Sequence, residues 1–150
     1  MKKLFVIMLA VITVSTISAK GWNAGLRIGS GFQAQTAYEF NKGAIEARFG
    51  MTWYYGTPID ADFQVLYYRN VLNTHEGIFI DAGAGFALGG RPNMCMYYGV
   101  TPSIKFGYKF SGAPVKIGVD WSPVIGGLSD GLGYFTRGLA NVGVSCVYCF

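Results

Sequence analysis

Residues Tyr98–Phe110, YGVTPSIKFGYKF, contain the clearest alternation in this 150-residue chain. Apolar residues stand at every second position, Pro102 among them, and small or polar residues stand between them. Successive side chains of a β-strand point to opposite faces, so a period of two indicates a strand with one apolar and one polar face. Because proline cannot donate a hydrogen bond to a sheet ladder, Pro102 predicts a bulge in this strand.

Seven further segments repeat this alternation and are separated by turn-forming residues. They cover residues 22–29, 32–40, 45–53, 61–68, 78–86, 115–122 and 140–150. Asn41-Lys42-Gly43 is typical of a tight hairpin turn. Residues Asn70–Glu76 predict a connection, Gly89–Met94 a loop, and Val124–Arg137 the longest irregular stretch. No segment has a convincing helical period, so the sequence predicts an all-β chain of eight antiparallel strands.

The beginning of the chain has the three parts of a secretory signal. Met1-Lys2-Lys3 is basic, residues 4–14 are apolar, and residues 15–19 are mostly small. The apolar run is shorter than the ~20 residues that a membrane-spanning helix needs. We therefore expect a cleavable signal peptide over residues 1–19 and one folded domain over residues 20–150.

The composition excludes several classes of protein. Hydrophobic residues make up 51% of the chain, aromatic residues 16% and charged residues only 13%, whereas soluble domains carry about 25% charged residues. The aromatic content excludes disorder, and the irregular spacing of the 22 glycines excludes collagen. Without Lys2 and Lys3 the net charge falls from +4 to +2, which argues against nucleic acid as a partner.

The residue volumes indicate which face of the barrel lies inside. An eight-stranded barrel has an interior just wide enough to be filled by side chains or one small ligand. The apolar face carries Trp, Phe or Tyr on nearly every strand and would overfill it, whereas the polar face is rich in glycine. The polar-face charges balance, with Arg27, Arg48, Lys105, Lys109 and Lys116 against Glu39, Glu46, Asp62, Asp81 and Asp120. These charges are expected to pair inside a narrow lumen, since unpaired buried charges are costly.

Aromatic residues also gather near the strand ends, as in the interfacial girdles of membrane barrels. One expected girdle contains Trp22, Phe40, Tyr67, Phe110 and Tyr148, and the other contains Phe32, Trp53, Tyr54, Tyr55, Tyr98 and Trp121. Together with the polar lumen, they predict an eight-stranded antiparallel up-and-down transmembrane β-barrel with both termini at the same end.

The last strand carries a resemblance to a known group of proteins. Phe150 ends the chain, and Tyr148, Cys146 and Val144 stand at alternate positions before it. With the signal and eight strands, this resembles the small OmpA-like and OmpX-like β-barrels of the bacterial outer membrane. The resemblance implies an outer-membrane location among lipids, both termini in the periplasm, and a C-terminal signal at Tyr148 and Phe150 that the barrel-assembly machinery recognises. The short first outer loop, Gly29-Ser30-Gly31, departs from that group, and the peptidoglycan-anchoring role of its two-domain relatives is not carried over.

Little in the sequence points to catalysis, a cofactor or a metal. His75 is the only histidine and is expected in a turn at the periplasmic end, so His-based nucleophile activation and metal sites have little support. Gly83-Ala84-Gly85 alternates along a strand and lacks the following helix of a dinucleotide loop. Cys146 and Cys149 are expected on opposite faces of one strand, and Cys95 at a loop edge, where it could pair between chains.

The sequence therefore favours a non-enzymatic outer-membrane protein with a structural or surface-interaction role. Asp81, Lys105 and Asp120 are expected to meet at mid-barrel in a structural ion-pair network, and Tyr134 and Phe135 are candidates for surface contact. Three alternatives stay open: a narrow pore or small-solute transporter, a lipid-modifying enzyme, and a secreted soluble ligand-binding barrel. The ligand, surface partner and oligomeric state are also open.

Overall fold

A computed structural model describes residues 21–52, 60–90, 96–128, 134–137, 139 and 141–150. Its strands are β1 (Trp22–Gly29), β2 (Gly31–Phe40), β3 (Gly43–Thr52), β4 (Asp60–Asn73), β5 (Ile78–Gly90), β6 (Met96–Lys109), β7 (Val115–Trp121), β8 (Val124–Leu128), β9 (Tyr134–Arg137) and β10 (Val142–Cys149). The expected signal peptide, Cys95 and residues 53–55 lie outside the described residues. Among the described residues, no helix is long and apolar enough to cross a membrane.

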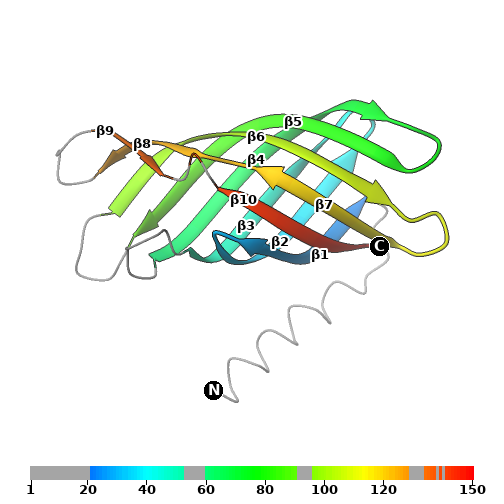
Figure 1. Ribbon diagram of the computed structural model, residues 1–150, viewed down its shortest axis with the longest axis horizontal. Coiled ribbons are helices and arrows are strands. Elements are labelled where there is room, and N and C mark those ends of the chain that lie inside the picture. Colours follow the sequence, from blue (N-terminus) through cyan, green and yellow to red (C-terminus); the bar gives the residue numbers. More distant parts are fainter. Residues whose placement is uncertain (1–20, 53–59, 91–95, 129–133, 138, 140) are drawn as a thin grey trace, which may run out of the picture.

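Eight of these strands close into an antiparallel barrel. Each of β1 to β6 pairs with the next, and β10 pairs with both β7 and β1, so the ring has no open edge (Figure 1). The barrel closes at the chain ends, where the Phe150 amide donates to the Trp22 carbonyl at 2.9 Å. The prediction of an all-β, eight-stranded antiparallel barrel is confirmed.

The stretch Val124–Arg137 was expected to be irregular, and this prediction is wrong for its two ends. β8 continues along β6 beyond the end of β7, and β9 pairs with β8, so these strands extend the wall at the end opposite the C-terminus (Figure 1). Pro123 separates β7 from β8 and lacks the donor that a continuous ladder would need. This proline made one long strand look like a strand followed by a loop.

Two further boundaries differ from the sequence-based expectation. β4 continues to Asn73, so residues 70–73 belong to a strand and not to a connection, and the register shifts between Asn70 and Leu72. β5 includes Gly89 and Gly90, which were expected in a loop.

The bulge predicted at Pro102 is absent, because the β5–β6 register runs without a shift through the Ala84–Pro102 pair. On its other side, the ladder of β6 with β7 ends at Ile104 and resumes with β8 at Val100. Pro102 lies in this interruption, where a missing N–H donor is tolerated.

Tight connections gather at the end that holds the chain termini. Asn41 and Lys42 form the two-residue turn between β2 and β3, as predicted. The β4–β5 turn requires Gly77, whose φ is +93° and where a Cβ would lie 2.3 Å from the Lys109 carbonyl oxygen. At the opposite end Ser30 alone joins β1 to β2, so the first connection there is very short, as expected.

Candidate functional site

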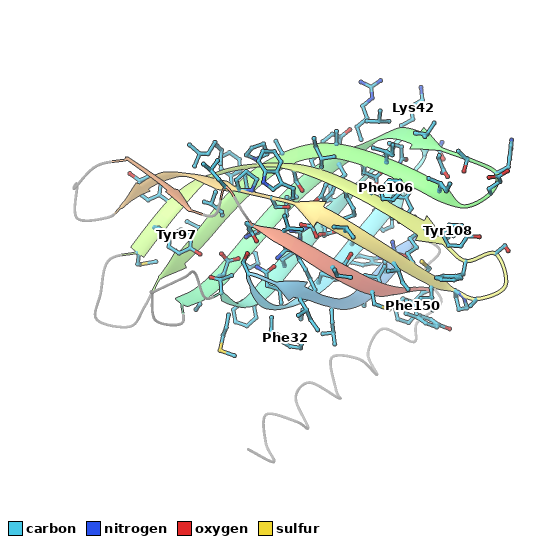
Figure 2. The ribbon with its side chains drawn as sticks, viewed as in Figure 1. Phe32, Lys42, Tyr97, Phe106, Tyr108 and Phe150 are labelled. Carbon is cyan, nitrogen blue, oxygen red and sulfur yellow. The ribbon has the colours of Figure 1, made fainter. Side chains whose placement is uncertain are left out.

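The barrel turns its apolar face outward and its polar face into the lumen. Large apolar side chains are exposed on every strand of the ring, including Phe49 at 65% and Phe86 at 72%. Figure 2 shows Phe106 and Tyr108 on this outer surface. In contrast, most of the fully buried large side chains are polar, Arg27, Arg48, Gln33 and Gln64 among them. The predicted assignment of the two faces is confirmed.

An aromatic girdle surrounds the end with the chain termini. The ring pairs there are Trp22–Tyr38, Phe40–Tyr67, Tyr108–Phe110 and Tyr148–Phe150, with centroids 5.0 to 6.0 Å apart. At the other end Trp121 donates its indole N–H to the Leu139 carbonyl at 2.6 Å. Trp53, Tyr54 and Tyr55 of the second expected girdle lie outside the described residues.

A chain of alternating charges crosses the middle of the lumen. The Arg27 Nε donates to Asp120 at 2.9 Å, and the Arg48 Nη1 donates to the same carboxylate at 3.2 Å. The Arg48 Nε donates to Glu46 at 2.6 Å, and Glu46 also accepts from Lys105. Two carboxylates thus join three cations drawn from β1, β3 and β6, and each charge has a partner of opposite sign, as burial demands.

Neutral polar groups accept further hydrogen bonds from the two guanidinium groups. Arg48 Nη2 donates to the Tyr68 hydroxyl at 2.8 Å, and Arg27 donates to the side-chain oxygens of Gln33 and Asn141 at 3.1 and 3.2 Å. Glycine provides the space for Arg27, because a Cβ at Gly143 would lie 2.4 Å from its Cζ. Side chains therefore fill the centre of the lumen, and its charged groups are hydrogen-bonded.

Asp62 lies toward the end that carries β8 and β9 and is bound by neutral donors. Gln33 Nε2 donates to one carboxylate oxygen at 2.8 Å and the Tyr97 hydroxyl to the other at 2.5 Å. Tyr97 also packs in a small buried apolar cluster with Ala87 and Val124. Side chains thus close the lumen on this side of the ion-pair chain as well.

A cavity of about 40 Å³ occupies the lumen on the side of the chain termini. Its lining includes Gln35, Glu39, Asp81, Lys105 and Lys116. A water molecule needs roughly 10–15 Å³ of such space, so the cavity accommodates a few waters. Lys116 pairs with Glu39 across it, and the buried Gln35 Oε1 has no hydrogen-bond partner among the described residues.

The nine residues expected in the lumen network fall into three groups. Arg27, Glu46, Arg48, Lys105 and Asp120 form the central chain, Glu39 and Lys116 form a separate pair, and Asp62 and Asp81 are bound by neutral side chains. Asp81, Lys105 and Asp120 are expected to meet at mid-barrel, and they are neighbours in the backbone register of β5, β6 and β7. The ammonium group of Lys105 instead reaches Glu46, and Asp81 accepts from Asn70 Nδ2 at 2.5 Å.

Candidate catalytic and metal-binding residues are not brought together. His75 is exposed in the β4–β5 turn at the end with the chain termini. No cluster of three or more His, Cys, Asp or Glu side chains suited to a metal occurs within the described part of the chain. Cys146 is exposed and Cys149 half-buried, and both are free thiols.

The expected surface and assembly residues lie at opposite ends. Tyr134 and Phe135 belong to β9 and pair with Gly127 and Gly126, in a strand of which only the backbone is described. Tyr148 and Phe150 lie in the girdle at the end with the chain termini.

The sequence-based network contained only charged residues and left out several neutral side chains that belong to it. Gln33, Tyr68, Tyr97, Ser122 and Asn141 all bind charged groups there. Gln33 and Tyr68 each occupy a polar-face position in the predicted alternation of their own strand. Including every inward position in the network, and not only the charged ones, would have identified them. Ser122 and Asn141 also stand at polar positions of the predicted alternation, whereas Tyr97 precedes the predicted strand that begins at Tyr98.

No family model, curated protein or solved structure matches this chain.

Proposed function

We propose that this protein is a non-enzymatic, integral outer-membrane β-barrel whose role is structural or surface-interactive. In this proposal residues 1–19 direct export, the apolar exterior contacts lipid, and the wall extension formed by β8 and β9 projects from the cell. The C-terminal Tyr148 and Phe150 serve in assembly of the barrel into the membrane.

The observation that carries the proposal is the exposed apolar exterior together with a charged, paired interior. In water such an exterior would be an aggregation surface far larger than the few hundred Å² that monomeric soluble proteins tolerate. In a bilayer, a closed barrel satisfies every ladder hydrogen bond and presents this face to hydrocarbon. The girdle that includes Trp22, Tyr38, Tyr108 and Tyr148 fits the boundary between hydrocarbon and headgroups.

The filled lumen favours a structural role over a pore. The Arg27–Asp120–Arg48 chain and its neutral partners fill the central section, and the cavity of about 40 Å³ lies to one side of it. Aqueous channels belong to wider barrels of 16 or more strands. A lipid-modifying enzyme is disfavoured because the only histidine lies at the end with the chain termini.

Gel mobility of the full chain in SDS tests the membrane assignment. We expect the protein in the outer-membrane fraction of a Gram-negative host, with a shift in mobility between unheated and boiled samples, because folded membrane barrels resist SDS until heated. A chain that stays in solution without detergent and shows no shift would overturn the proposal and favour a secreted ligand-binding barrel.

Conductance in planar bilayers separates the two membrane roles. The structural role predicts no unit conductance steps from barrels that show the heat-dependent shift. Reproducible steps from these barrels would favour the narrow pore.

A further inference from the structure

The lumen cavity on the side of the chain termini contains an oxygen atom that no donor reaches. Gln35 lines this cavity of about 40 Å³ and is only 5% exposed, and its Oε1 atom accepts no hydrogen bond within the described part of the chain. A buried acceptor without a donor costs free energy, so it usually has a water molecule or an ion as its partner. The position of this atom therefore indicates a species bound in the cavity.

The ionised side chains of the lumen leave an excess of one negative charge. Its described carboxylates are Glu39, Glu46, Asp62, Asp81 and Asp120, and its described cations are Arg27, Arg48, Lys105 and Lys116. Lys109, which the sequence placed on the polar face, is exposed at the end of β6 and does not line the cavity, so water screens its charge. Because a buried charge is costly unless it is paired, one further positive charge would stabilise the lumen.

Asp81 is the carboxylate that this excess leaves open to a further cation. Among the described residues, Asp62 and Asp81 are the lumen carboxylates without an ion pair. Both oxygens of Asp62 already accept hydrogen bonds, from Gln33 and Tyr97. Asp81 lines the cavity, and only its Oδ1 atom accepts a described hydrogen bond, from Asn70. The cavity therefore presents a carboxylate oxygen and an amide oxygen to which no described group donates.

We propose that this cavity binds one monovalent metal cation, sodium or potassium, together with a few water molecules. Gln35 Oε1 and the free oxygen of Asp81 would hold the ion, directly or through water, since hard cations prefer oxygen ligands. The cavity has room for such a group, because one water molecule needs roughly 10–15 Å³ of the same kind of space.

The charge of the surroundings favours a monovalent ion over a divalent one. The ammonium groups of Lys105 and Lys116 lie on the same cavity and repel a cation in it. One positive charge balances the lumen, whereas two would exceed the balance. The site does not depend on the proposed membrane location, because the lumen has the same lining whichever phase covers the exterior.

Sodium NMR of the full chain, folded in an uncharged detergent at neutral pH, tests the site. We expect the barrel to broaden the sodium line, because a bound ion tumbles with the protein, and potassium chloride to reverse the broadening. Gln35→Leu removes the unpaired acceptor and Asp81→Asn the free charge, and each should weaken sodium binding about tenfold, as for the loss of one contact to a charged group. A purely structural Gln35 predicts no change in the sodium line.

Glu76→Gln is the matched control for these variants. It removes an exposed carboxylate at the same end of the barrel, outside the cavity lining, and should leave the broadening unchanged. Circular dichroism checks that each variant folds. If Asp81→Asn does not fold, Gln35→Leu decides the test, since it removes a buried polar group that has no described partner.

Four results would overturn the proposal. Without broadening by the folded, unchanged chain, the cavity holds water alone. Equal broadening by the unchanged chain and by Gln35→Leu would place the sodium elsewhere, and loss of broadening in Glu76→Gln would assign it to diffuse surface charge. Displacement of sodium by far less calcium chloride than potassium chloride would identify a divalent site. None of these results changes the membrane assignment, which the gel shift tests.

Discussion

Asp120 is the residue that joins the two arginines of the lumen. Its carboxylate accepts from Arg27 and Arg48, and also from the Ser122 hydroxyl at 2.8 Å. Asp120→Asn keeps the shape but removes the charge, which leaves Arg27 without its ion-pair partner. Removing one partner of a buried ion pair costs about 3–5 kcal/mol. We expect the free energy of unfolding to fall by that amount, measured by urea titration of the barrel in lipid vesicles.

Asp81→Asn provides the control for this change. Asp81 is only half-buried, and it accepts a hydrogen bond from the neutral Asn70 side chain. The same chemical change there should shift the unfolding midpoint far less. Equal midpoints for the two variants would show that the shared carboxylate has no special role.

Lys105 has a smaller expected effect than Asp120. Lys105→Met removes one partner of Glu46, but Glu46 keeps its ion pair with Arg48. We expect a loss of about 1.5–3 kcal/mol, as for a hydrogen bond to a charged group, in the same urea titration. Unchanged unfolding of this variant would contradict a structural role for the Lys105–Glu46 pair.

At this scale the sequence predicts which charges lie inside but not which ones pair. Alternation along each strand assigns a side chain to a face, and that is sufficient to place Arg27, Arg48 and Asp120 in the lumen. Pairing also depends on the stagger between strands and the reach of long side chains. Lys105 therefore finds Glu46 on β3 across the lumen and not Asp81 beside it.

Among the elements, the junctions between β7 and β8 and between β9 and β10 are joined at Asn141, by one hydrogen bond of its side chain and one of its backbone. Asn141 Nδ2 donates to the Ser122 carbonyl at 2.6 Å, and the Ser122 amide donates to the Asn141 carbonyl at 3.0 Å. Asn141→Ala should cost about 1–3 kcal/mol, because the Ser122 carbonyl and Arg27 each lose a buried partner. We expect faster amide hydrogen exchange in β8 and β9, measured by mass spectrometry.

Asn23→Ala is the matched change at the other end of the lumen. Asn23 donates to Glu39 at 2.7 Å and touches neither junction. It should leave exchange in β8 and β9 unchanged. If both variants accelerate exchange there equally, Asn141 acts through overall stability and not as a local clamp.

The same elements show where reading a sequence for strands fails. β8 and β9 were missed because Pro123 precedes β8 and Gly126-Gly127 removes its alternation, so the only remaining signal was turn-like composition. The end of β4 was missed because Asn70 and Asn73 favour turns, and the register shift after Asn70 breaks the period. In both places, pairing with a long neighbouring strand overrides local preference.

For the whole molecule, closure and the inside–outside assignment followed from periodicity and volume alone. Eight short alternating strands joined by tight turns leave no unpaired edge strand if they close into a barrel. The interior of such a narrow barrel cannot hold the Trp, Phe and Tyr side chains of the apolar face, so that face must lie outside. The exterior is thus the less polar surface, the reverse of a water-soluble protein. If lipid covers this exterior, a charged substitution on it should lower the free energy of unfolding, whereas if water covers it the substitution should have little effect.

Val144→Arg places a charge at mid-height on the outer surface. Val144 is 52% exposed and lies between Ile28 of β1 and Val119 of β7. If lipid covers this surface, the charge should cost about 2–4 kcal/mol of unfolding free energy in vesicles. Leu72→Arg, at a 45% exposed position beyond Tyr67 toward the chain termini, should cost about 0–1 kcal/mol because it lies near the headgroups. If water covers it, both substitutions should fall within about 0.5 kcal/mol of the unchanged chain, and that result would contradict the membrane location.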